Sequence, residues 1–283
     1  MAVTKHPWAS WVLAIALAVA ASAPHVVRAA PERPDRPLPM PPPVFQIIAE
    51  SPGMSLHDEM YVLPYTYADL YHGSRSEIAY QISVKQVIFK SRLYFAYRQL
   101  SFWQAYNVKE SSPFRDSNYN PEVFYRAAQR PWAGGSLGAD LGVEHESNGQ
   151  RDAVSRSLNQ VYVTPAWQRG GLLLRVNVRW RIPEPAKSSP SDAIGDDNPD
   201  ITEYLGYADL HAYYRGQSGR QAHLMVRGNP AEGHGYVSLN LSRKLPHDPS
   251  AWFVLMLSHG YGESLLDYDR KVSRVGIGFM LAR

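Results

Sequence analysis

The chain has 283 residues, a formal net charge of +3, 18 tyrosines, 7 tryptophans and no cysteine. The lack of cysteine excludes a disulfide framework as the source of stability. The small charge, without a basic cluster interleaved with aromatic residues, argues against a nucleic-acid partner. The many tyrosines and tryptophans instead fit a protein with aromatic girdles at two membrane interfaces.

The N-terminal residues have the pattern of an export signal. Lys5 precedes an apolar run from residue 8 to 23, and small residues follow it. This run is shorter than the roughly 18 residues of a membrane-spanning helix, so we expect residues 1–30 to be a secretory signal peptide rather than an uncleaved anchor. Seven prolines lie between residues 31 and 43. They predict an extended, proline-rich periplasmic lead-in over residues 31–58.

The rest of the chain has no long apolar run, and its apolar and polar residues alternate. The side chains of a strand point to opposite faces in turn, so this alternation predicts strands with one apolar face. It is strongest over residues 171–182, where arginines 175, 179 and 181 share the polar face. A lone strand would leave its backbone groups unpaired in lipid, so strands cross a membrane only as a closed barrel.

We predict twelve such strands, each close to the length that a tilted membrane-crossing strand needs. They cover residues 59–69, 77–90, 92–106, 121–130, 135–147, 157–168, 171–182, 201–215, 219–228, 233–243, 249–259 and 272–283. The expected fold class is therefore all-β, with a single transmembrane antiparallel β-barrel of about 12 strands over residues 59–283.

The connections between these strands alternate between short turns and longer loops. The short turns are expected near residues 91, 131–134, 168–170, 216–218 and 244–249. The longer loops are expected at 70–76, 107–120, 148–156, 183–200 and 259–271, and the short connection 229–232 is an exception. Bacterial outer-membrane barrels have this pattern, with turns in the periplasm, loops outside and both termini in the periplasm.

Polar residues interrupt the apolar face at the end of the strand 135–147. His145 and Ser147 continue the face to which Val143 belongs. Their Cα atoms should lie about 7 Å apart, so an imidazole can reach the hydroxyl. A hairpin symmetric about the middle of the next loop places His145 directly opposite Asn159, which also faces outward. Three polar side chains are therefore expected to meet on an apolar wall.

These three residue types fit nucleophilic catalysis. Ser147 would be the nucleophile and His145 the general base, with Asn159 orienting the imidazole. An amide cannot stabilise the imidazolium as a carboxylate would, so the site should be slow unless another group supplies charge. The ordinary alternative to a catalytic site is a histidine at the membrane interface whose polar end is hydrated, followed by turn residues at Asn148 and Gly149.

Several motifs then occur in a fixed order along the chain. They are His145-Glu146-Ser147-Asn148-Gly149, Ser155-Arg156-Ser157-Leu158-Asn159, Ser111-Ser112-Pro113-Phe114-Arg115, and Asp196-Asp197-Asn198-Pro199-Asp200-Ile201. From about Tyr61 to the C-terminus, the chain resembles the bacterial outer membrane phospholipase A family.

This resemblance implies a calcium-dependent serine-type phospholipase A1/A2 of the bacterial outer membrane. Its substrates would be the acyl esters of membrane phospholipids and lysophospholipids. His145, Ser147 and Asn159 would have the roles given above, and homodimerisation would activate the enzyme.

The resemblance also implies where Ca²⁺ would bind. Ser155 and the backbone carbonyl of Gln150 would hold the ion in one protomer, and Ser111 would reach it from the other. The Gly149 amide and a calcium-bound water would form the oxyanion hole. A hard cation with oxygen ligands suits this task. Asp152 and Asp197 match positions of a second calcium site in the monomer.

Two alternatives remain from the sequence. A catalytically silent structural or pore-forming barrel would keep the strand alternation but would need neither Ser147 nor calcium. A soluble secreted β-sandwich esterase would bury outward residues such as Leu174 and Val178 in a core. The sequence does not determine a preference for the sn-1 or sn-2 chain, the headgroup or the trigger of dimerisation.

Overall fold

The computed structural model describes residues 45–49, 53–69, 74–89, 91–189, 191–192, 194–216, 219–246 and 250–281. The signal peptide expected at residues 1–30 lies outside these ranges, as does the first part of the expected lead-in. Within the described residues, no helix has the length and apolar character needed to cross a membrane.

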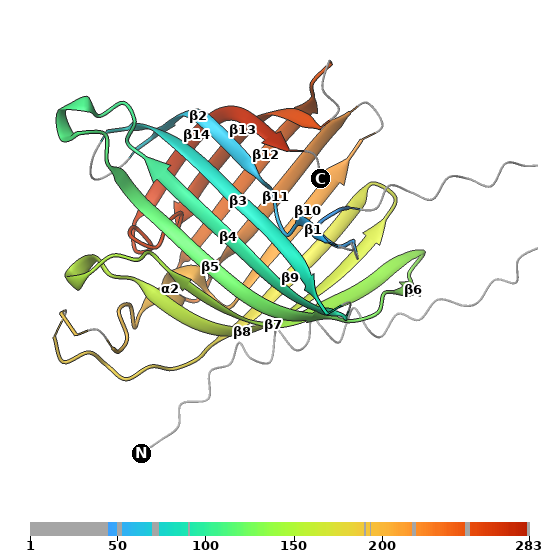
Figure 1. The fold of residues 1–283 in the computed structure, drawn as a ribbon, viewed down its shortest axis with the longest axis horizontal. Coiled ribbons are helices and arrows are strands. Elements are labelled where there is room, and N and C mark those ends of the chain that lie inside the picture. The colour runs from blue at the N-terminus through green and yellow to red at the C-terminus, as the bar shows by residue number, and fades with distance from the viewer. Residues whose placement is uncertain are drawn as a thin grey trace, which may run out of the picture.

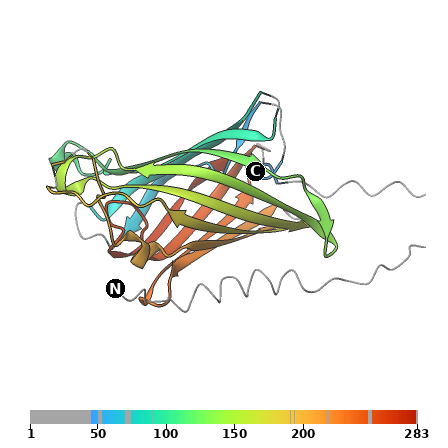
Figure 2. The same cartoon turned by 90° about the horizontal axis from the view of Figure 1, so that it is seen from below.

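Twelve strands of the described ranges form a closed antiparallel β-barrel, which confirms the expected fold class (Figures 1 and 2). The strands are β2 Tyr61–Ala68, β3 Ser76–Ile88, β4 Leu93–Trp103, β5 Phe114–Arg126, β7 Gly135–Ser147, β8 Ser157–Arg169, β9 Leu172–Arg181, β10 Ala208–Arg215, β11 Arg220–Asn229, β12 His234–Lys244, β13 Ala251–Tyr261 and β14 Lys271–Leu281. Each strand pairs with the next along the chain, and β14 pairs with β2 to close the ring.

Short elements accompany the ring. The strand β1 (Met54–Leu56) pairs with β3, and β6 (Arg130–Trp132) pairs with β7. Two 3₁₀ turns (Val108–Glu110 and Asp152–Val154) and the helix α2 (Ile201–Leu205) lie in the longer connections. These connections gather at one end of the barrel, opposite the short turns (Figure 1).

Two strands begin seven residues away from the predicted start. β5 begins at Phe114 rather than at 121, because Asp116, Asn118 and Asn120 are buried toward the lumen and not exposed in a loop. The Asn118 side chain donates to Asp116 Oδ2 at 2.6 Å and accepts from the Leu265 N–H at 3.0 Å. Polar residues at alternate positions are therefore lumen-facing strand residues here.

The second difference is at the start of the strand predicted for 201–215. Residues 201–205 form α2, and β10 begins only at Ala208. The helix forms because Ile201 is fully buried in a small apolar cluster with Leu158 and Leu265, beside the barrel end. Local packing thus replaces strand pairing over this turn.

The two faces of each strand differ as a membrane barrel requires. On β7, Leu141 and Val143 are 61% and 51% exposed, whereas Asp140 and Glu144 are buried. The outer wall is apolar and the lumen is polar, which is the arrangement expected in a bilayer. A β-sandwich core, by contrast, would bury the apolar face, so the soluble esterase alternative is wrong.

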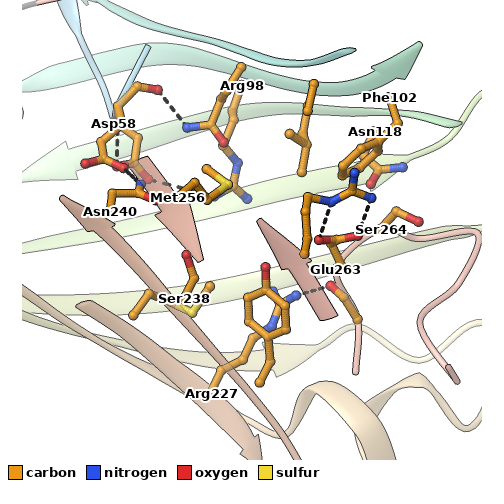
Figure 3. A pocket seen from close by; sticks show the side chains of 18 of the residues that line it. Asp58, Arg98, Phe102, Asn118, Arg227, Ser238, Asn240, Met256, Glu263 and Ser264 are labelled. Atoms are coloured by element: carbon orange, nitrogen blue, oxygen red, sulfur yellow. Dashed lines mark hydrogen bonds and ion pairs between the residues drawn. The ribbon is translucent and has the colours of Figure 1, made fainter. Parts of the chain in front are cut away.

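Ion pairs occupy much of the lumen. Arg274 is bonded to Glu77 and Glu263, each at 2.7 Å, and Arg115 lies 3.0 Å from the same Glu77. Asp58, Arg98 and Glu263 line a pocket of about 130 Å³ inside the barrel. Figure 3 shows these three side chains around it. Buried charges need such partners, because an unpaired ion in a low dielectric is costly.

The last part of the expected lead-in also lies inside the barrel. Phe45 and Ile47 are each 1% exposed and pack against Leu173 and Tyr213. The buried Lys85 ammonium donates to the carbonyl oxygens of residues 46, 47 and 56. Residues 45–49 and 53–58 are thus part of the barrel core, which leaves little room for a water-filled pore.

Replacing Arg274 with alanine should lower the free energy of unfolding by about 3–5 kcal/mol, because the buried Glu263 loses its ion-pair partner and the buried Glu77 keeps only Arg115. Urea unfolding in lipid vesicles measures this change. The Arg243→Ala variant, at an exposed position on β12, is the control and should change stability by less than about 0.5 kcal/mol. Equal midpoints for the two variants would contradict the importance of the luminal ion pairs.

Candidate active site on the outer wall

The register of β7 and β8 places His145 directly opposite Asn159. The two side chains meet at the outer wall, where His145 Nδ1 lies 2.9 Å from Asn159 Oδ1. Both are half-buried. An amide oxygen can only accept, so Nδ1 carries the proton in this contact and Nε2 is left as the basic nitrogen. The predicted pairing of these two residues therefore exists in the folded chain.

Ser147 follows two residues later on the same outward face of β7, opposite Ser157 and Tyr119 of the neighbouring strands. Its side chain is half-buried. Among the hydrogen bonds of the described residues, none joins Ser147 to His145. The structure thus brings His145 and Asn159 into direct contact and places Ser147 beside them.

A fourth side chain, which the sequence analysis did not select, lies next to these three residues on the outer wall. The Asn159 amide nitrogen donates to Glu184 Oε1 at 2.8 Å. Glu184 lies just beyond β9, whose register continues because the Ile182 N–H donates to the Asn159 carbonyl at 2.8 Å. Extending the outward alternation from Trp180 and Ile182 by one more step would have found it.

The loop after Ser147 is built around a buried asparagine. Asn148 is 2% exposed, and its Oδ1 accepts from the backbone N–H groups of Arg156 at 2.9 Å and Gln150 at 3.3 Å. Its amide nitrogen donates to the Val154 carbonyl at 2.9 Å. These bonds close the loop 148–156 into a fixed shape at the end of the barrel.

Gly149 has a φ of +64°, a backbone conformation that glycine adopts without the steric cost of a side chain. No recorded hydrogen bond of the described part of the chain uses the Gly149 N–H. A backbone donor without a protein acceptor, next to a serine, is what an oxyanion site needs.

Of the candidate calcium ligands, Ser155 and Asp197 are in contact. Ser155 Oγ donates to Asp197 Oδ2 at 3.0 Å, and Ser157 Oγ donates to the same atom at 3.1 Å. The other carboxylate oxygen forms an ion pair with Lys187. Burial acts to raise the pKa of the Asp197 carboxyl, but the bonds from Lys187 and the two serines lower it below its usual value.

The remaining candidates do not gather in one protomer. The side chains of Gln150 and Asp152 are exposed, and Asp152 touches Ser155 only through its backbone carbonyl. Ser111 is exposed in the connection between β4 and β5. The hydroxyl and carboxylate oxygens fit a hard cation. The Asp197 carboxylate already forms an ion pair with the Lys187 ammonium, so its surroundings favour a bound cation.

An apolar groove of about 380 Å³ lies on the outer wall beside the histidine. Its lining includes Phe95, Val123, Val143 and Ile182, together with His145 and Asn159. A hydrocarbon chain can therefore lie against the wall next to His145 and Asn159.

Fold and site together define a bacterial outer-membrane β-barrel with a serine, a histidine and an asparagine on its outer wall. The family model described as Phospholipase A1 matches residues 50–281, and the chain belongs to this family.

Known proteins of this kind are similar to the chain. A putative phospholipase A1 of Neisseria meningitidis serogroup B is 34% identical over 258 residues, which are 81% of this chain and 65% of that relative. The chain thus spans just under two thirds of the relative's length.

Two solved structures are similar over most of their length. The outer membrane phospholipase A from Escherichia coli has a TM-score of 0.72 at 30% identity, covering 80% of this chain and 97% of that one. The Salmonella typhi outer membrane phospholipase dimer with bound calcium has a TM-score of 0.72 at 31% identity, covering 81% and 92%.

Replacing Asn148 with alanine should open the loop 148–156, because three hydrogen bonds are lost. We expect trypsin to cut after the exposed Arg151 at least about tenfold faster, as detected by mass spectrometry. The Asn148→Asp variant keeps the oxygen that accepts two of the bonds, so trypsin should cut it at an intermediate rate. Cleavage of the alanine variant at the wild-type rate would show that Asn148 does not hold the loop.

Proposed function

We propose that the protein is a serine-type phospholipase that hydrolyses acyl ester bonds of phospholipids and lysophospholipids in the outer membrane. The observation that carries the proposal is the hydrogen bond between His145 and Asn159 on the lipid-facing wall, with Ser147 on the same face. Polar side chains at these positions have no packing role against lipid, whereas a lipid substrate would lie against them.

In the proposed reaction, His145 Nε2 takes the proton of Ser147 as its Oγ attacks the ester carbonyl. Asn159 accepts the hydrogen bond of Nδ1–H and holds the imidazole in the required tautomer. The imidazolium then protonates the departing alcohol, which leaves an acyl group on Ser147. Water, activated by the same histidine, releases the fatty acid. The free Gly149 N–H would stabilise the oxyanion.

The outer wall supports a substrate that stays in the bilayer. The apolar groove beside His145 offers an acyl chain a surface of Phe95, Val123, Val143 and Ile182. The site lies where β7 meets the end with the longer loops, so an ester group at the depth of the headgroup region would be level with Ser147. The phospholipid therefore need not leave the membrane to react.

Calcium is part of the proposal. Ser155 and the Gln150 carbonyl would hold the ion together with Ser111 of a second copy, and Asp152 and Asp197 would form a second site in the monomer. Bound calcium would supply positive charge where the oxyanion develops. A calcium-bound dimer is described for the similar Salmonella typhi phospholipase.

Activation by homodimerisation is supported by the outer wall itself. On β4 the outward Gln99 accepts from the Tyr97 hydroxyl at 2.8 Å and donates to Ser101 at 3.0 Å. Ser101 bonds to Ser117 of β5 at 2.9 Å. Ser101 is fully buried among these neighbours, whereas Tyr97, Gln99 and Ser117 are half-buried on the outward face, where a second copy would offer them further partners. Ser117 lies on β5, which pairs with β7, and the other three lie on β4, one strand further away, so a dimer here would flank Ser147.

Replacing Ser147 with alanine should reduce release of lysophospholipid and fatty acid at least about 10³-fold, because the nucleophile is lost. Hydrolysis by the detergent-purified protein is measured with and without calcium. Ser136→Ala, near the opposite end of β7, is the control and should stay active. Full activity of Ser147→Ala would exclude the nucleophile, and a wild type without calcium-stimulated hydrolysis would favour the silent structural barrel.

Replacing Lys187 with alanine should tighten calcium binding to the monomer about fivefold, because Asp197 loses its internal cation. Calorimetric titration of the detergent-dispersed monomer with calcium measures the affinity. Lys244→Ala, at the exposed end of β12, should leave the affinity unchanged. An unchanged affinity for Lys187→Ala would remove Asp197 from the set of calcium ligands.

A further inference from the structure

A series of hydrogen bonds crosses three neighbouring strands on the outer wall. It runs from His145 on β7 to Asn159 on β8 at 2.9 Å, and from Asn159 to Glu184 beyond β9 at 2.8 Å. We propose that Glu184 is a positioning residue of the active site, whose carboxylate fixes the orientation of the Asn159 amide. The inference rests on the proposed function and adds a fourth member to its site.

The need for such a residue follows from the shape of an amide. The oxygen and nitrogen of Asn159 have nearly the same size, so packing alone does not select which of them faces His145. With the nitrogen turned toward the ring, Nδ1 would have to accept and Nε2 would carry the proton. In that tautomer His145 could not take a proton from Ser147.

Glu184 removes this ambiguity, because an ionised carboxylate can only accept a hydrogen bond. The amide nitrogen of Asn159 must point to Glu184, and its oxygen must then point to His145. The carboxylate also places a negative charge behind the neutral amide. This charge lies on the side of His145 where a Ser-His-Asp triad has its carboxylate, one amide further away.

The segment that carries Glu184 is bonded to other parts of the protein both before and after this residue, and the Ile182 N–H that precedes it donates to the Asn159 carbonyl of β8. Ala186 forms a β-bridge with Asp196, and the Asp196 N–H donates to the Pro185 carbonyl at 2.8 Å. Arg181, at the end of β9, forms an ion pair with the Asp196 carboxylate. The backbone around Glu184 is therefore held in place, so its carboxylate can impose an orientation on Asn159 rather than adapt to it.

The test compares Glu184→Ala and Glu184→Gln in the detergent-purified, calcium-loaded protein. Alanine removes the acceptor, so kcat should fall about 5- to 20-fold with KM within about twofold of the wild type. Glutamine has both an acceptor and a donor and therefore permits both orientations of Asn159, so its loss should be smaller. Glu232→Ala, an exposed glutamate between β11 and β12, is the matched control and should keep the wild-type kcat.

A second background separates positioning from general structural damage. In the Asn159→Ala variant there is no amide to orient, so adding Glu184→Ala should change the remaining kcat by less than about twofold. Heat-modifiable migration on gels verifies that every variant retains the folded barrel. The same loss in both backgrounds, or a kcat of Glu184→Ala within twofold of the wild type, would overturn the proposal.

These results are distinguishable from a failure of the proposed function. If Ser147→Ala keeps wild-type turnover, the assignment of the site fails and the role of Glu184 fails with it. If Ser147→Ala is inactive while Glu184→Ala is fully active, only the role of Glu184 is refuted.

Discussion

The closed ring of antiparallel strands is the constraint on which the rest of the structure depends. In lipid every backbone N–H and C=O must pair within the protein, and a ring leaves no unpaired edge. Once the ring is closed, the alternation of side chains leaves two environments, lipid outside and a narrow polar lumen inside. Every residue on a strand has to suit one or the other.

This constraint explains the position of the site. A polar residue at an outward position is placed against lipid, where it has no solvent and few partners. His145 and Asn159 satisfy one another because β7 and β8 are neighbours and the two positions are in register, and Glu184 bonds to Asn159 from just beyond β9. The barrel thus acts as a rigid frame that spaces His145 and Asn159 by the distance between strands. The start of the connection between β9 and β10 then places Glu184 behind Asn159.

The alternation of residues made most of the fold and part of the site predictable. It assigned the outward face to His145, Ser147 and Asn159. The hairpin between β7 and β8 fixed the pairing of His145 with Asn159. It failed at β5, where Asn118 and its neighbours have the composition of a loop but are buried by the lumen. Polarity alone cannot separate a luminal residue from a loop residue.

Glu184 and Lys187 were missed for a different reason. Both belong to the connection between β9 and β10. Glu184 continues the outward alternation of Trp180 and Ile182 past the end of the strand, whereas Lys187 lies further along the connection, where no repeating pattern extends. The contact of Lys187 with Asp197 depends on how the two ends of this connection come together, and single-sequence periodicity carries no information about that. The roles given to Gln150 and Asp152 depend in turn on a bound ion, and the role of Ser111 depends on a second copy of the chain as well.

The segment inside the lumen has a consequence for assembly in the membrane. Residues 45–49 contact Lys85 of β3, Arg126 of β5 and Tyr213 of β10, which lie on different sides of the ring. These partners come together only when the wall between them has formed. Residues 45–49 precede every strand of the barrel in the chain, yet they must reach their final place late, after the strands that follow them have enclosed their binding site.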